Sequence, residues 1–211
     1  MEASTEQTDD EVLETWRSGD ASAGSELYRR HVDKLYRFFC NKVSIGVDDL
    51  VQDTLLACLE SENSFEKRST FLAFLFGIAR FKLYSHYRKL KRDNLALDFE
   101  QVTVSDLEPS PSQHAAENSE QRLLLEALRR LPLNLQLALE LSYWEELPAP
   151  EIAAILDIPT DTVYSRLRRA KQLLEQELKR LSLSKHSPHP TETDLEAWAA
   201  TLRSKPARNP P

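Results

Sequence analysis

Apolar side chains recur every three or four residues along most of this 211-residue chain, which is the spacing of an amphipathic α-helix. The chain has only four glycines and its apolar runs are short, which disfavours a β-rich fold and a nucleotide-binding α/β fold. We therefore predict an all-α fold. Asp48 or Asp49 is expected to cap the third helix, and Ser69 or Thr70 to open the fourth. The expected helices span about 9–17, 21–43, 48–59, 70–92, 119–130, 133–145, 151–156 and 160–181.

The helical pattern stops at residues 93–118, which are acidic and contain Pro109 and Pro111. A stretch of this length without a pattern of its own is rare inside one compact domain. We therefore interpret it as a flexible acidic linker between two small helical domains. The predicted divisions are an acidic N-terminal segment with the first helix at 1–21, a first domain at 22–92, the linker at 93–118, a second domain at 119–181 and a Pro-containing tail at 182–211.

Residues 147–171 have the plan of a DNA-reading helix-turn-helix: a short apolar helix, a tight break, and a helix that starts on hydroxyls and continues into arginines. Thr160 is expected to cap the second helix. A plain three-helix bundle with a solvated basic face is the alternative. The apolar positions expected to face the core are Val163, Leu167, Ala170, Leu173 and Leu174. The positions left on other faces are Asp161, Thr162, Tyr164, Ser165, Arg168 and Arg169.

The net charge of −7 argues against nucleic acid as a partner, but its distribution reverses that inference. Residues 80–92 hold six cations and no acid, and residues 166–171 hold four cations and no acid. A phosphate responds mainly to charges within a Debye length of ~10 Å, so these local stripes matter more than the total charge.

The first basic stripe also carries aromatic rings, at Phe81, Tyr84 and Tyr87 beside Arg88. Binding of single-stranded DNA needs cations along the backbone and π faces for the bases. This helix therefore suits unstacked bases, whereas the helix-turn-helix suits duplex DNA. The alternative is that Phe81 and Tyr84 pack beneath the helix and the cations are only solvated.

A third feature is an acidic helical face near Asp48, where Asp49 and Asp53 lie one turn apart and flank Gln52. Paired carboxylates can bind a metal or serve in acid–base catalysis, but no third ligand, histidine or glycine-rich loop accompanies them. We therefore expect no enzyme, no cofactor and no metal. Capping of the helix is the simplest role of these acids, and docking of a basic partner is a further one.

Composition also bounds the location of the protein. Cys40 and Cys58 lie in apolar helical patterns, and we interpret both as reduced core residues of a cytoplasmic protein. No apolar run approaches the ~18 residues of a membrane span. In the tail, residues 195–202 form a small apolar stripe that either docks on a domain or a regulator or stays free. His186 and His189 have no cysteine nearby to complete a metal site.

Taken in order, the three features resemble the sigma-70 family of bacterial transcription initiation factors, and most closely its extracytoplasmic-function group. The resemblance covers about residues 22–92 and 119–181 and excludes both tails. Residues 48–55 are similar to the family's motif for the clamp helices of RNA polymerase. Residues 71–80 are similar to its promoter-melting helix, and residues 151–170 to its −35-reading helix-turn-helix.

The resemblance implies a monomer that binds core RNA polymerase and promoter DNA, and it leaves an anti-sigma factor open as a further partner. It also implies that the linker runs through the polymerase channels. The implied polymerase-binding residues are Asp48, Asp49, Gln52 and Asp53. The implied −10 contacts are Asn63, Ser64, Phe65, Arg80, Lys82, Tyr84, Tyr87 and Arg88. The implied −35 contacts are Thr160, Thr162, Tyr164, Ser165, Arg166, Arg168 and Arg169.

The chain departs from the family pattern at four positions. Phe81 stands where asparagine is usual, Asp161 and Asp157 where glycine is common, and Tyr164 where lysine is common. An acid and a phenol on the DNA side predict an unusual −35 preference. Two other functions remain open: a helix-turn-helix regulator that binds duplex DNA without polymerase, and a sigma-like interaction module.

Overall fold

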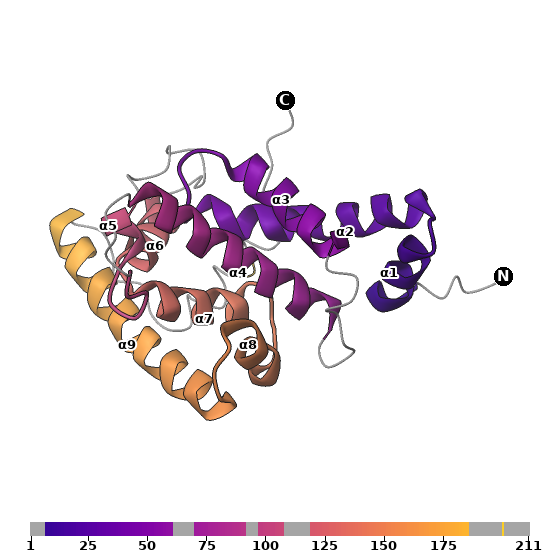
Figure 1. Cartoon of the computed structure of the whole chain (residues 1–211). Helices are drawn as coiled ribbons and strands as arrows, with labels where there is room; N and C mark the ends of the chain where they lie inside the picture. The colour runs from indigo at the N-terminus through magenta and orange to yellow at the C-terminus, as the bar shows by residue number, and fades with distance from the viewer. Residues whose placement is uncertain (1–6, 61–69, 92–96, 108–118, 186–199, 201–211) are drawn as a thin grey trace.

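The computed structural model describes residues 7–60, 70–91, 97–107, 119–185 and 200. Within these ranges every regular element is a helix, and the only bridge joins Thr103 and Pro132, so the predicted all-α fold is confirmed (Figure 1). The helices are α1 (Asp9–Arg17), α2 (Ala21–Cys40), α3 (Val47–Glu60), α4 (Phe71–Leu90), α5 (Val104–Leu107), α6 (Ser119–Arg129), α7 (Leu133–Tyr143), α8 (Ala149–Leu156) and α9 (Thr160–Lys185).

The starts of α1, α2 and α4 follow from side chains that accept the first amide protons. Thr8 and Glu11 form a reciprocal capping box at α1, and the Asp20 carboxylate accepts the amide of Ser22 at 2.8 Å at α2. Thr70 caps α4, as expected, by accepting the amide of Ala73.

Two predicted caps are wrong. α3 begins at Val47, directly after Gly46 with its positive φ, so Asp48 and Asp49 lie in the first turn of the helix. There their negative charges still interact favourably with the positive end of the helix dipole. α9 begins at Thr160 itself, because the Pro159 carbonyl already accepts the amide of Thr162 at 2.9 Å.

α2, α3 and α4 lie in the predicted first domain, and α1, from the predicted N-terminal segment, packs against it. α2, α3 and α4 share a core whose buried members include Leu35 and Phe39 of α2, Val51 and Cys58 of α3, and Leu75, Phe76, Ala79, Leu83 and Tyr87 of α4. α1 packs across α2, where the indole of Trp16 lies against Gly24.

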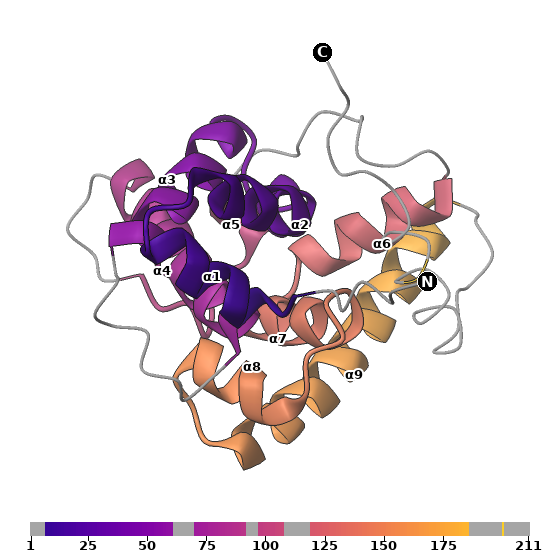
Figure 2. The ribbon, with the colours of Figure 1, turned by 90° about the vertical axis from the view of Figure 1, so that its right-hand side faces the viewer.

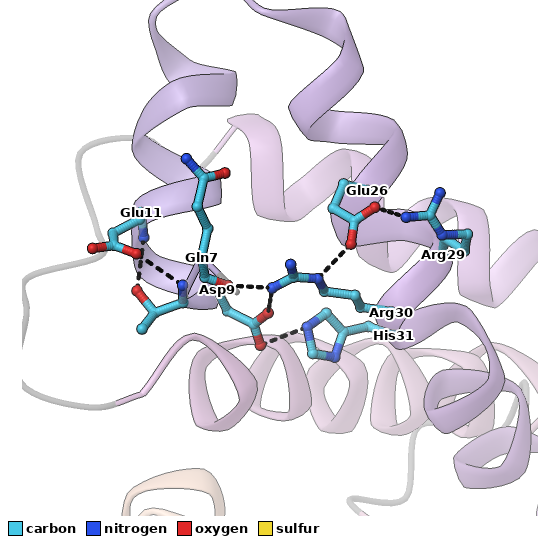
Figure 3. A network of polar contacts seen from close by, with 8 residues as sticks. Gln7, Asp9, Glu11, Glu26, Arg29, Arg30 and His31 are labelled. Atoms are coloured by element: carbon cyan, nitrogen blue, oxygen red, sulfur yellow. Dashed lines mark hydrogen bonds and ion pairs between the residues drawn. The ribbon is translucent and has the colours of Figure 1, made fainter. Parts of the chain in front are cut away.

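A polar network also ties α1 to α2 (Figure 3). The Asp9 carboxylate accepts a hydrogen bond from Arg30 at 3.0 Å, and its other oxygen lies 2.7 Å from Nε2 of the buried His31. Burial lowers the pKa of the His31 imidazole, while the Asp9 carboxylate opposes that shift. Glu26 holds Arg30 from the other side at 2.7 Å.

The second domain consists of α6 to α9, with α7 at its centre. α7 contacts α6, α8 and α9, and most of its residues are buried. Figure 2 shows α7 behind α1, with α8 below it and α6 and α9 to the right. Leu124, Leu128 and Leu139 join residues of α9 in a core that belongs to this domain alone.

The two domains pack directly on each other, since one apolar core runs from Val12 in α1 to Val163 in α9. α4 lies across the middle of the molecule, with α3 on one side and α7 and α8 on the other (Figure 1). The Thr70 hydroxyl donates to Glu151 of α8 at 2.7 Å, which links the start of α4 to the helix-turn-helix.

A buried ion pair lies inside this domain contact. The fully buried Lys42, just beyond α2, pairs with Glu140 of α7 and also donates to the Phe38 carbonyl at 2.6 Å. The Gln136 amide donates to the second Glu140 oxygen at 2.8 Å. Nearby, Arg129 of α6 donates to the carbonyl of Asn41 at 2.7 Å.

Residues 97–107, in the middle of the predicted linker, pack against both domains. Phe99 is buried, and its carbonyl accepts the amide of Asn134 at 3.3 Å. The Val102 carbonyl accepts the amide of Leu133 at 3.0 Å. Because Pro132 supplies no side-chain cap, these two carbonyls provide the partners that the first amides of α7 need.

Both cysteines are unpaired thiols, as expected. Cys58 is buried and Cys40 is half-buried, and burial raises the pKa of each to about 12. Within the ranges that the structure describes, no helix has the length and apolar character needed to cross a membrane.

Two helix-interior glycines should respond oppositely to alanine. A Cβ on Gly24 would overlap the Trp16 indole, whereas a Cβ on Gly77 would meet nothing within 4 Å. Gly24→Ala should lower the free energy of unfolding by about 1–3 kcal/mol through overpacking. Gly77→Ala should raise it by about 0.5–1 kcal/mol through helix propensity. Urea denaturation measures both, and equal effects would contradict the packing described for Trp16.

Removing one partner of the buried ion pair should destabilise the protein strongly. Lys42→Met leaves Glu140 buried beside one amide donor, at an expected cost of about 3–5 kcal/mol in unfolding free energy. The double variant Lys42→Met/Glu140→Gln should recover much of that loss, because an uncharged amide can still accept from Gln136. Urea denaturation of the four proteins gives the coupling energy.

The matched control is Lys179→Met in the exposed pair Lys179–Glu175 of α9, which should cost less than about 0.5 kcal/mol. The pair is not coupled if the losses in unfolding free energy from Lys42→Met and Glu140→Gln add up to that of the double variant. A loss for Lys42→Met no larger than that for Lys179→Met would show the same.

Candidate nucleic-acid interface

The helix-turn-helix is formed by α8, residues 157–159 and α9. Asp157 ends α8 in the left-handed conformation, with φ of 54°, and the amide of Ile158 donates back to the Ala153 carbonyl at 3.1 Å. This closing bond is typical of helix ends that usually carry glycine. Aspartate is among the few other residues that tolerate the conformation, so the departure at Asp157 preserves the turn.

The start of α9 separates into an apolar and a polar side, as predicted. Val163, Ala170 and Leu174 are buried, and Leu167 and Leu173 pack against the core. Tyr164 is 59% exposed. Asp161, Ser165, Arg168 and Arg169 are also exposed, whereas Thr160 and Thr162 are half-buried.

Arg166 differs from the other arginines of α9, because its side chain is only 13% exposed. Its guanidinium pairs with the carboxylate of Glu100, which comes from the predicted linker. A residue expected to contact DNA is therefore engaged within the chain.

The three aromatic rings of the basic stripe in α4, Phe81, Tyr84 and Tyr87, have different environments. Phe81 is 62% exposed. Tyr84 is largely buried, and its hydroxyl donates to the Asn134 side chain at 2.6 Å. Burial raises the pKa of the Tyr84 phenol, while cations including Arg80 oppose that shift.

The third ring, Tyr87, is fully buried, and its hydroxyl donates to the Lys42 carbonyl at 2.8 Å. Tyr87 is thus part of the packed interior and is unavailable to DNA in this arrangement. Of the predicted cations, Arg88 is exposed, whereas Arg80 and Lys82 are half-buried. The Arg80 guanidinium lies 5.5 Å from the Tyr84 ring centre.

A cavity of about 450 Å³ lies where α3, α4 and α8 meet. Its lining is mostly apolar, with Lys82 as its one charged residue, and combines Ala57 of α3 and Ala154 of α8 with residues of α4. The exposed Phe81 is part of this lining.

The acidic face of α3 is fully accessible. Asp48, Asp49, Gln52 and Asp53 are all exposed, and Leu56 continues the same face one turn further along. Among the described residues, no group of three or more histidine, cysteine, aspartate or glutamate side chains could hold a metal ion.

Some predicted site residues cannot be placed. Asn63, Ser64 and Phe65 lie outside the described residues, as do His186, His189 and most of the apolar stripe of the tail.

Sequence reasoning missed the groups that hold the domains together. Glu140 is a lone charge among Leu137, Ala138, Leu139 and Leu141, and a charge inside such an apolar run signals a buried partner. Nothing in the sequence near Lys42 identifies it as that partner. Phe99 was detectable as a lone aromatic residue within an acidic stretch.

Two family models match the chain. The one described as "Sigma-70 region 2" covers residues 26–93, and the one described as "Sigma-70, region 4" covers residues 121–174. The first match contains α3 and α4, and the second contains the helix-turn-helix.

Curated relatives are similar over most of their length. The chain is 32% identical over 167 residues to the RNA polymerase sigma factor HrpL of Pseudomonas syringae pv. syringae, covering 77% of this chain and 91% of the relative. It is 29% identical over 187 residues to the ECF RNA polymerase sigma-E factor of Escherichia coli strain K12, covering 84% and 98%.

Two solved structures share the fold. The sigma factor RpoE of Bartonella quintana, in complex with the anti-sigma factor NepR, has a TM-score of 0.56 and 26% identity, covering 74% of this chain and 96% of that one. CnrH, in complex with the cytosolic domain of CnrY, has a TM-score of 0.60 and 24% identity, covering 82% and 99%.

Proposed function

The chain belongs to the sigma-70 family, in its extracytoplasmic-function group, and we propose that three of its surfaces divide the work of promoter recognition. It is a transcription initiation factor that binds core RNA polymerase and directs it to promoters. The observation that carries the division is the start of α9, where one side of the helix is core and the other presents exposed arginines.

The acidic face of α3 is the proposed polymerase-docking surface. Asp48, Asp49, Gln52 and Asp53 are exposed on one helix, and the exposed Leu56 adds an apolar contact. Carboxylates on a helix surface suit a basic partner, and rim charges of this kind guide association and fix orientation.

The second surface is α4, for which we propose a role at the −10 element during melting. Arg88, Lys82 and Arg80 supply cations for a strand backbone, and the exposed Phe81 and the Tyr84 ring supply π faces. Asn63, Ser64 and Phe65 remain proposed partners of a flipped base. Tyr87 would reach DNA only if the packing around it changed.

The third surface is the polar side of α9, for which we propose the −35 element. The first turns of a recognition helix enter the major groove, where Thr162, Tyr164 and Ser165 would face base edges. Arg168 and Arg169 would hold phosphates, with Arg166 joining them once it leaves Glu100. Thr160 would lie at the phosphate backbone.

The two DNA surfaces must separate before they can be used together. The −10 and −35 elements are about 25 base pairs apart, roughly 85 Å of duplex at 3.4 Å per base pair. In this structure Tyr84 stacks on Phe99 and Arg166 pairs with the next residue, Glu100, so the two surfaces meet at neighbouring residues. We therefore propose that the two domains part when the protein joins the polymerase.

We further propose that the protein works in the bacterial cytoplasm and that an anti-sigma protein controls it. The support for the second point is the Bartonella quintana relative, which was solved in complex with such a protein.

Reversing the charge of the acidic face should abolish polymerase binding and leave the fold intact. Asp49→Lys/Asp53→Lys replaces two exposed acids, so unfolding free energy should change by less than about 0.5 kcal/mol. Co-purification with core RNA polymerase measures docking. The control Asp10→Lys/Glu175→Lys makes the same charge change on exposed positions of α1 and α9 and should still co-purify. Unchanged co-purification of the α3 variant would exclude the docking role.

Removing the exposed arginines of α9 should weaken promoter binding at every sequence. For the polymerase complex, Arg168→Ala/Arg169→Ala should reduce the slope of log affinity against log salt by about 0.9 for each phosphate that these side chains no longer neutralise. Fluorescence anisotropy over a salt series measures the slope. Lys179→Ala, near the other end of α9, is the control and should leave it unchanged. A slope that did not move in the double variant would rule out phosphate binding by Arg168 and Arg169.

A further inference from the structure

Two neighbouring linker residues contact DNA-binding candidates from both domains. The Phe99 ring stacks on the Tyr84 ring with centres 4.1 Å apart and an interplanar angle of 12°. The Arg88 guanidinium lies 5.8 Å from the centre of the Phe99 ring. A flat ring that stacks on a tyrosine and lies close to an arginine has the contacts of a nucleic-acid base on a single-strand binding surface.

The next residue, Glu100, pairs with Arg166 of the recognition helix. Arginine recognises carboxylates and phosphates through the same planar fork of N–H donors, so a carboxylate can stand in for a phosphate at this position. An aromatic ring followed by an anionic group therefore takes the places of a base and a phosphate.

The backbone around these two residues is fixed to the second domain. The Phe99 carbonyl accepts the amide of Asn134, the Val102 carbonyl accepts the amide of Leu133, and the Asn134 side chain accepts the Tyr84 hydroxyl. The same linker segment thus stacks on Tyr84 and supplies hydrogen-bond acceptors to the first amides of α7. A DNA strand that displaced Phe99 would also remove the carbonyl partners of α7.

We propose that Phe99 and Glu100 act as a built-in mimic of one nucleotide, which occupies the DNA-binding side chains Tyr84, Arg88 and Arg166 while the protein is free of polymerase. DNA and the linker then compete for the same groups, and the free protein binds DNA weakly. This inference rests on the DNA roles proposed above. It gives the linker a second role beyond connecting the two domains, namely blocking DNA-binding side chains in each of them.

The test compares DNA binding by the free, full-length protein with and without the mimic. Phe99→Leu keeps an apolar side chain in the buried position but removes the stack, and Glu100→Gln removes the charge from a side chain that is 53% exposed. The probes are a fluorescein-labelled mixed-sequence 20-nucleotide single strand and the corresponding duplex, at low salt. Because apparent affinity falls with the fraction of competent protein, Phe99→Leu/Glu100→Gln should bind both probes at least about fivefold more tightly than wild type.

The control must separate competition from a simple loss of negative charge. Glu175→Gln removes one glutamate charge from an ion pair on α9, away from the mimic, and should change affinity less than about twofold. A gain for the linker variant no larger than that of the control would overturn the proposal.

Hydrogen exchange gives an independent readout in the wild-type protein. Saturating single-stranded DNA should accelerate exchange of the Leu133 and Asn134 amides, because the linker carbonyls leave them. DNA binding with undiminished protection of these amides would also overturn the proposal.

Failure of this inference is distinguishable from failure of the DNA roles. If Arg168→Ala/Arg169→Ala lowers the salt slope of the polymerase complex but the linker variant binds DNA like wild type, the DNA roles stand and the mimic falls. If neither measurement changes, both fall.

Discussion

Lys42 and Glu140 carry opposite charges inside the contact between two domains, where Lys42 is fully buried and the Glu140 side chain is only 11% exposed. Burying a single charge costs several kcal/mol, so each of these groups depends on the other's staying in place. One stands at the end of α2 and the other in the middle of α7, which means that the pair fixes how the domains face each other. The hydrogen bonds of Arg129 to Asn41 and of Tyr87 to Lys42 lie beside it and define the same arrangement.

The consequence for function is a chain whose DNA-binding groups are assembled before they are accessible. The exposed arginines of α9 and the acidic face of α3 are open in this arrangement. Tyr84 and Arg166 are engaged by the linker, and Tyr87 is fully buried with its hydroxyl bonded to the Lys42 carbonyl. With the roles proposed above, the polymerase-docking surface is already free in this arrangement, and the promoter surfaces would become complete only after the domains part. This order suits a factor that should recognise DNA only as part of a larger enzyme.

Much of this architecture could be predicted from the sequence, because it is local. The three-to-four spacing of apolar residues placed the helices, and the turn at residues 157–159 and the buried side of α9 followed from the same pattern. The caps at Asp48 and Thr160 were predicted wrongly, because α3 starts directly after Gly46 and α9 directly after Pro159, so both side chains lie inside a helix rather than just before it. Capping rules consider the capping side chain and do not take account of the backbone of the residue before it.

The contact between the domains could not be predicted, because it depends on pairs far apart in the chain. Lys42 and Glu140 are 98 residues apart, and Glu100 and Arg166 are 66 apart. A single sequence shows that each residue is charged but gives no signal that one meets the other. The aromatic residues of α4 illustrate the same limit: Phe81 is exposed, whereas Tyr87 is interior and its hydroxyl donates to the carbonyl of Lys42, 45 residues away in the chain.

The Thr70 hydroxyl acts both as a hydrogen-bond acceptor and as a donor. Its oxygen accepts the amide of Ala73 within α4, and its O–H donates to the carboxylate of Glu151 in α8. Only the second bond crosses between the domains. If α8 moves away, the hydroxyl can donate to water instead of Glu151, while its oxygen still accepts the amide of Ala73. If the domains part as proposed, the first turn of α4 keeps its cap, and this end of α4 would meet the promoter as a helix that needs no new nucleation.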